Sequence, residues 1–222
     1  MSTFILFLTL VVLCYYAWCT KVLAQQQIES NKFSALTSIH ERMARGRTKR
    51  LSLHNYFRER LVNAVKSVLG TEFVGPQGVD MGRLVACPKL PSDVRTFNNQ
   101  LDQKEMVKPA LPAGGMPTYD NALETVESVL TDFDIIALPF WEGIPAATTT
   151  LKAYGNVIEN TAPLVLPFVL IQMRLRDDPE YKKHYVFMLK RLGVLEKMGV
   201  DLSPLGIPEP KRETSWWRRV FP

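Results

Sequence analysis

The chain has 222 residues, 46% hydrophobic and 22% charged, which excludes an intrinsically disordered protein and leaves room for one modest domain with extended segments. The formal net charge is +5, but it is arranged in blocks: residues 25–70 are basic, residues 71–150 acidic and residues 151–222 basic again. This layout lacks the uniform basic face of a nucleic-acid-binding protein and is typical of a chain that contacts several different surfaces.

Residues 1–24 are predicted to form a transmembrane helix. No side chain from Met1 to Thr20 is charged, and twenty helical residues rise about 30 Å, the thickness of a hydrocarbon core. The residues expected at the membrane interface lie at the C-terminal end of this segment: Tyr15, Tyr16, Trp18 and Lys21. Because the basic stretch follows the segment, we expect a single-pass protein with its N-terminus outside and its body on the matrix or cytoplasmic side.

A cleaved signal peptide is the competing interpretation of the same segment. Val22-Leu23-Ala24 resembles a small-residue cleavage site, and residues 4–13 have the length of a signal-peptide core. However, no basic residue precedes the apolar run, and an aromatic cluster followed by Lys21 is a poor approach to a cleavage site. The membrane anchor is therefore favoured.

Residues 25–50 are predicted to continue the anchor as an amphipathic stalk, because apolar residues recur at near-helical spacing and no Gly or Pro precedes Gly46. The stalk ends in a basic run: Arg42, Arg45, Arg47, Lys49 and Arg50. This run is a candidate contact for an acidic partner surface or anionic lipid. A solvated loop that only orients the membrane helix is the alternative, and residues 47–50 also match a furin-type cleavage pattern.

Residues 51–107 are predicted to form a helical region with a Gly/Pro loop. We expect a helix from Ser52 to Gly70, a loop with a short strand around residues 84–86, and a helix capped by Ser92-Asp93 that reaches Met106. Residues 108–118 contain three prolines and two glycines and are predicted to be an extended linker.

Residues 119–202 are predicted to be helical, first acidic and then basic. A helix is expected to start at Asp120, and another at residues 178–180 with its end at Gly193. Two apolar stretches, residues 135–140 and 162–173, contain prolines that are expected to interrupt them. We expect both to form buried core, with a membrane-touching segment at 163–173 as the alternative.

The predicted acidic helix carries paired carboxylates, which occur in acid–base catalysis but need a pocket and separated pKa values. The carboxylates in question are Glu124, Glu127, Asp132 and Asp134. We expect them to be solvated or paired with the basic run or another basic neighbour.

Residues 203–222 are predicted to form an extended tail, which ends in a second candidate contact for a partner or for lipid: Trp216, Trp217, Arg218 and Arg219.

No catalytic, cofactor or metal site is predicted. His40, His54 and His184 lack partners at ligand spacing, and Cys14, Cys19 and Cys87 are too few and too scattered for a disulfide framework. The chain also contains no Asn-x-Ser/Thr sequence. Both features argue against an extracellular compartment.

These observations predict a mainly α protein with one N-terminal transmembrane helix, a small, mostly helical soluble body and proline-rich extended arms. The expected function is that of a non-catalytic accessory, structural subunit of a multi-subunit membrane complex, with a respiratory or ATP-synthase complex of the mitochondrial inner membrane as the best guess. Its partners would be other subunits and membrane lipid, not nucleic acid or a small-molecule substrate. The alternatives are a membrane-tethered adaptor, an enzyme with an unfamiliar site on the acidic helix, and a secreted protein.

Overall fold

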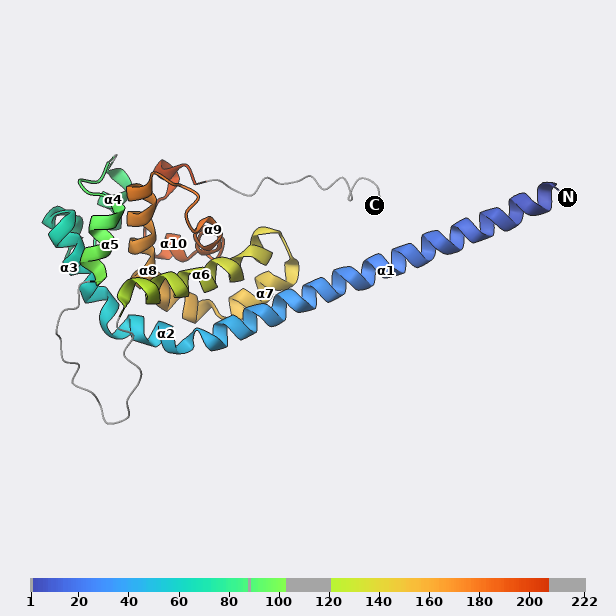
Figure 1. Cartoon of the computed structure of the whole chain (residues 1–222), viewed down its shortest axis with the longest axis horizontal. Coiled ribbons are helices and arrows are strands. Elements are labelled where there is room, and N and C mark those ends of the chain that lie inside the picture. Colours follow the sequence, from blue (N-terminus) through green and yellow to red (C-terminus); the bar gives the residue numbers. More distant parts are fainter. Residues whose placement is uncertain (1, 88, 103–120, 208–222) are drawn as a thin grey trace, which may run out of the picture.

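The computed structural model describes residues 2–87, 89–102 and 121–207, and these ranges are mainly helical (Figure 1). The elements in chain order are α1 (Ser2–Arg45), α2 (Arg47–Ser52), a π-helical turn η1 (Leu53–Phe57), α3 (Arg58–Val68), a 3-10 turn η2 (Thr71–Phe73), β1 (Val74–Gly75), β2 (Gly78–Val79), α4 (Met81–Ala86), α5 (Val94–Asp102), α6 (Ala122–Trp141), α7 (Pro145–Ala153), α8 (Gly155–Arg176), α9 (Lys183–Arg191), α10 (Val194–Lys197) and a 3-10 turn η3 (Ser203–Leu205). The linker over residues 108–118 lies outside the described residues.

Helix α1 is one uninterrupted helix of 44 residues, about 66 Å long. Its N-terminal part projects away from the helical body, and its C-terminal part packs against α6 and α7 (Figure 1). Leu36 is the first of its residues packed on the core, and Ile39 and Met43 are buried in it. The helix therefore runs without a break through the ranges expected to form the anchor and most of the stalk.

The helical backbone continues after a single turn at Gly46. Helix α2, the π-helical turn and α3 follow one another directly, so the helix expected to begin at Ser52 already begins at Arg47. Inserting the π-helical turn rotates the following residues about the axis, and both Leu53 and Phe57 are fully buried. The segment ends as expected at Gly70, whose φ of 118° is a conformation that favours glycine.

The Gly/Pro-rich loop after α3 folds into a small antiparallel hairpin, with Val74 paired to Val79. The prediction of a strand around residues 84–86 is wrong, because this segment belongs to helix α4. The Asp80 side chain accepts the Arg83 amide at 3.0 Å and starts that helix as an N-cap. Asp93 caps α5 in the same way, as the sequence predicts.

Prolines do not interrupt the apolar stretches, contrary to the expectation: Pro139 lies inside α6, and Pro163 and Pro167 lie inside α8. Helix α8 tolerates them because it is the centre of the body, with every residue from 164 to 173 buried. Among the residues whose side chains the structure describes, which leave out residues 1–8, α8 is the one helix that is long and apolar enough to cross a membrane, and 72% of its most apolar stretch is covered by the body. Residues 164–173 thus form core, as expected.

The core is built around two closely packed helix pairs, α6 with α9 and α3 with α5, while α8 contacts α4, α5, α7 and the π-helical turn. Phe133 of α6 stacks on Tyr185 of α9, with ring centroids 5.5 Å apart. Helix α9 begins at Lys183, later than the predicted start at residues 178–180, because Asp177 and Lys182 adopt left-handed backbone conformations that interrupt the helical path.

Candidate membrane and partner contacts

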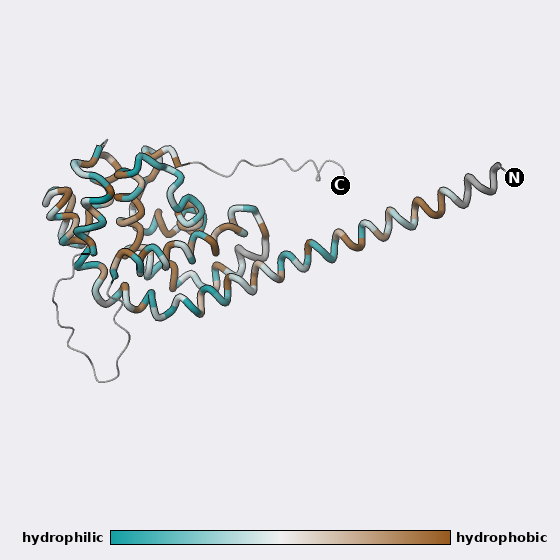
Figure 2. The backbone as a smooth tube through the Cα atoms, in the orientation of Figure 1, coloured by the Kyte–Doolittle hydropathy of each residue, from teal (hydrophilic) through white to brown (hydrophobic). Residues whose placement is uncertain are grey.

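Between Leu10 and Ile28, α1 carries several large apolar side chains that are exposed, and this part of the helix projects away from the body (Figure 2). Leu13 is 60% exposed, Trp18 61% and Leu23 65%. Tyr15 lies next to Tyr16 and Trp18, with ring centroids 6.4 and 6.3 Å apart. An aromatic cluster therefore closes the apolar segment just before Lys21.

The stalk sets the distance between this cluster and the body. Leu36, where the helix joins the core, lies fifteen positions after Lys21, which corresponds to about 22 Å of helix. The apolar residues Ile28 and Phe33 of the intervening part are also exposed. The body consequently begins well beyond the aromatic cluster.

Three of the five basic-run side chains face the body. Arg42 forms an ion pair with Asp132 of α6 at 3.1 Å, and Lys49 donates a hydrogen bond to Ser128 on the same helix. Arg50 is buried and donates to the Met43 carbonyl. These contacts join α1 and α2 to α6, so these three residues serve the packing of the body in this structure.

Arg50 is the most enclosed cation of the run. Its guanidinium carbon lies 5.9 Å from the centroid of the Phe133 ring. Burial lowers its pKa from the ordinary value, and the nearby Asp132 carboxylate counteracts part of that effect. Because Arg50 is helical and buried, the furin-type pattern of residues 47–50 is not presented as an extended, accessible strand.

The remaining two basic-run residues lie at the surface. Arg45 forms an exposed ion pair with Glu41, one helical turn earlier, at 3.1 Å. Arg47 is exposed at the start of α2. Of the five residues of the basic run, only Arg45 and Arg47 are exposed and so accessible to a partner or to lipid.

The second predicted contact lies outside the described residues; it consists of Trp216, Trp217, Arg218 and Arg219.

The carboxylates of α6 are engaged by basic and polar neighbours. Glu127 accepts a 2.7 Å hydrogen bond from the Tyr181 hydroxyl and lies 3.7 Å from the Lys182 ammonium. Burial, together with this hydrogen bond, raises the pKa of Tyr181. Asp134 accepts the Tyr185 amide at 3.1 Å and pairs with His184. This arrangement fastens α9 to α6, as a structural ion-pair network does.

The three histidines are dispersed over the body. His40 lies against the Tyr154 hydroxyl at the junction of α1 with the body, His184 packs against Trp141, and His54 is exposed on the π-helical turn. Within the described ranges no three His, Cys, Asp or Glu side chains gather as metal ligands would. The Cys87 thiol, for its part, donates to the Lys89 carbonyl.

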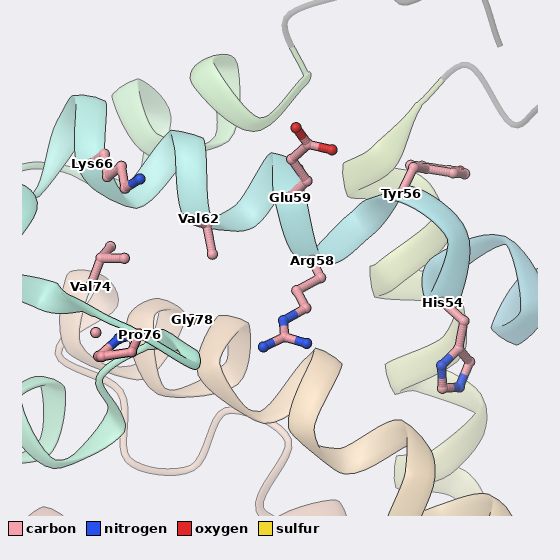
Figure 3. Close-up of a pocket in the computed structure, with 10 residues that line it drawn as sticks. His54, Tyr56, Arg58, Glu59, Val62, Lys66, Val74, Pro76 and Gly78 are labelled. Carbon is pink, nitrogen blue, oxygen red and sulfur yellow. The ribbon is translucent and has the colours of Figure 1, made fainter. Parts of the chain in front are cut away.

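Sequence patterns did not reveal a cleft beside α3, between that helix and the β1–β2 hairpin (Figure 3). Its volume is about 460 Å³, and its lining is His54, Tyr56, Arg58, Glu59, Val62, Lys66, Val74, Gly75, Pro76 and Gly78. The only signal in the sequence is a basic helix followed by a Gly-Pro-Gln-Gly turn. That signal does not say that the turn folds back over the helix.

The chain matches no known protein family, no curated protein and no solved structure. The geometry of α1, of its junction with the body and of the cleft therefore carries the functional conclusion.

Proposed function

We propose that this protein is a non-catalytic accessory subunit of a membrane protein complex, anchored by residues 1–24 and holding its helical body off the bilayer. The observation that carries this proposal is the single helix α1. It combines exposed apolar side chains between Leu10 and Ile28 with a C-terminal end, from Leu36 on, that is built into the core of the body.

The energetics of the exposed apolar segment favour a lipid environment. Burying one large apolar side chain contributes about 1.5–3 kcal/mol, and residues 10–13 alone are four such side chains, each about half exposed. A continuous helix also satisfies its own backbone hydrogen bonds, as a membrane-spanning segment must. Tyr15, Tyr16, Trp18 and Lys21 then occupy the positions that aromatic and basic residues prefer at an interface.

The acidic helix supports a packing role over a catalytic one, because Glu127, Asp132 and Asp134 are used to hold α1 and α9 against α6. For the compartment, we favour the mitochondrial inner membrane on composition: the chain is basic, contains three cysteines and lacks an Asn-x-Ser/Thr sequence.

The test is extraction of the full-length chain from membranes with alkaline carbonate, followed by native gels in mild detergent. The wild-type chain is expected to stay in the membrane fraction and to comigrate with a large complex. Leu13→Arg places a charge near the middle of the anchor, which costs about 3 kcal/mol of insertion free energy, and should move the protein into the soluble fraction.

Phe33→Arg is the matched control, because Phe33 is 74% exposed on the stalk, outside the proposed anchor. It should leave membrane retention unchanged. A mature chain that begins after Ala24 would overturn the anchor in favour of a signal peptide. Migration of the detergent-extracted chain as a free small protein would overturn the subunit proposal and favour a tethered adaptor.

A further inference from the structure

The cleft beside α3 continues into a second cavity of about 330 Å³ toward α8 and α10. Arg58, Val62 and Gly78 line both cavities, so Arg58 stands where they meet. Gly78 has a φ of 120°, and a Cβ added to it would come within 3.6 Å of the Arg58 side chain. That separation is an ordinary van der Waals contact, so the φ of Gly78, and not a lack of space, is what favours glycine in the hairpin.

The cleft is cationic. Arg58 and Lys66 line it, with Glu59 as its single carboxylate, and Figure 3 shows Arg58 and Glu59 pointing to opposite sides of α3. Arg58 donates to the Gln77 carbonyl, which anchors the guanidinium but does not neutralise it. Over the described ranges, no carboxylate lies within ion-pair distance of Arg58 or Lys66.

Several other basic side chains of the body are paired with carboxylates. Arg42 pairs with Asp132, Arg176 with Glu127 and Lys197 with Glu159. Arg58 and Lys66 have no such partner among the described residues, and both line the cleft, so their charge is available there to a bound partner. An arginine beside apolar surface, with N–H groups left to donate, is a typical centre of a protein interface.

The second cavity supplies the apolar surface. Residues from the hairpin, α4, α8 and α10 line it, among them Val79, Met81, Pro163, Leu164, Pro167 and Met198. Methionine side chains adapt to the shape of an apolar partner. The two cavities together therefore fit a group with a negative charge next to an apolar side chain.

The position of the cleft decides between membrane lipid and a protein partner. Helix α3 lies at the end of the body farthest from the N-terminus of α1 (Figure 1). With about 22 Å of stalk before the body even begins, headgroups of the anchoring membrane lie beyond the roughly 10 Å over which exposed charges interact.

The openness of the cleft decides between a chain segment and an enclosed small molecule. None of the ten residues that line the larger cavity is buried, whereas small-molecule sites enclose most of the ligand surface. We propose that this cleft is a docking site for an acidic segment of a neighbouring subunit, with one carboxylate at Arg58, another at Lys66 about 12 Å further along α3, and an adjacent apolar side chain over α8 and Met198. The proposal rests on the proposed function, since it needs the chain to be part of a complex.

The test uses the full-length chain in its native membrane, with a photoreactive amino acid in place of Gln77 at the tip of the hairpin. The crosslinked peptide is then sequenced, and an Asp- or Glu-rich segment of another subunit is expected. The double variant Arg58→Glu with Lys66→Glu should reduce this crosslink about tenfold or more, as loss of an interfacial charge pair does. Changing the acidic residues of the mapped segment to Lys should restore it.

The matched control is Arg95→Glu with Lys152→Glu, which makes the same change in charge at exposed positions outside the cleft. Circular dichroism checks that both double variants stay folded. Equal crosslinking in the two double variants, a crosslink to a segment without acidic residues, or none while the wild-type chain still comigrates with its complex would each overturn the docking site and leave the proposed function standing. A wild-type chain that migrates alone would instead overturn the proposed function.

Discussion

Replacing Asp132 by Asn tests whether charge holds the stalk helix against the body. The Asp132 carboxylate pairs with Arg42 at 3.1 Å, and the two side chains are 22% and 31% exposed. Two unit charges at about 4 Å interact by roughly 4 kcal/mol at an effective dielectric constant of 20, but desolvation and side-chain ordering offset much of this. Exposed pairs contribute about 0–1 kcal/mol and removing one partner of a buried pair costs about 3–5 kcal/mol. This half-buried pair lies between those limits.

Asp132→Asn should therefore lower the free energy of unfolding by about 2 kcal/mol, because it also leaves the buried Arg50 without its acidic neighbour. The measurement is urea unfolding of the full chain in mild detergent, followed by circular dichroism. A double-mutant cycle with Arg42→Gln should give a coupling energy of about 1 kcal/mol.

Glu41→Gln is the control for this cycle. Glu41 pairs with Arg45 in the same α1 helix, with the same 3.1 Å separation, but the two side chains are 58% and 72% exposed. Its removal should cost less than about 0.5 kcal/mol. If Asp132→Asn costs no more than Glu41→Gln, or the coupling energy with Arg42 is zero, then apolar packing alone joins α1 to the body and the electrostatic reasoning is refuted.

Three further predictions concern the body, with stability read by the same unfolding measurement. Gly70→Ala should lower the free energy of unfolding by about 1–3 kcal/mol, because φ is 118° at that position. Gly155→Ala should raise it by about 0.5–1 kcal/mol, because no atom lies within 4 Å of the added Cβ. Equal effects of the two substitutions would contradict this reasoning. Phe57→Ala should cost about 3–5 kcal/mol because the ring is fully buried, and a loss under 1 kcal/mol would count against this core. Hydrogen bonds from the Thr96 amide and hydroxyl lower the pKa of Asp93 below 3.8, so the cap stabilises the folded state above that pH, and this stabilisation is lost as the pH falls through the lowered pKa. In an NMR titration, Thr96→Val should raise the Asp93 pKa part of the way back to its ordinary value. An unchanged pKa would disprove the contribution of the hydroxyl.

Periodicity identified the helices, and local propensity misplaced several of their ends. The apolar face of α6 over residues 123–133 could be predicted because a 3.6-residue repeat depends only on the helix itself. The continuity of α8 through Pro163 and Pro167 could not, since each interior proline costs about 3 kcal/mol by itself. In the structure, burial of residues 164–173 on nearly all sides outweighs that cost. Tertiary packing of this kind is invisible to a local pattern.

The candidate contacts, too, could be predicted only in part from the sequence. The sequence located the basic run and offered the acidic helix as one of its pairing partners, and in the structure Arg42 pairs with Asp132. Which cations turn inward could not be predicted, because the sequence left a solvated loop open as the alternative for this run; residues 47–50 are helical, and Arg50 lies against Phe133. The cleft around Arg58 depends on the hairpin folding back over α3, a contact between segments about twenty residues apart.

The continuity of α1 suggests what a helical stalk would add to a simple tether in an accessory subunit. A tether needs only length, and a Gly- or Pro-containing linker would provide it. Helix α1 has neither residue over its 44 positions, and Ile39 and Met43 lock its end into the core while Arg42 is held by Asp132. An anchor and a body joined in this way share one orientation, because a helix without such breaks bends only gently. On the proposed function, the stalk would therefore set both the height and the direction of the Arg58 cleft, and these are the quantities that docking onto a neighbouring subunit requires.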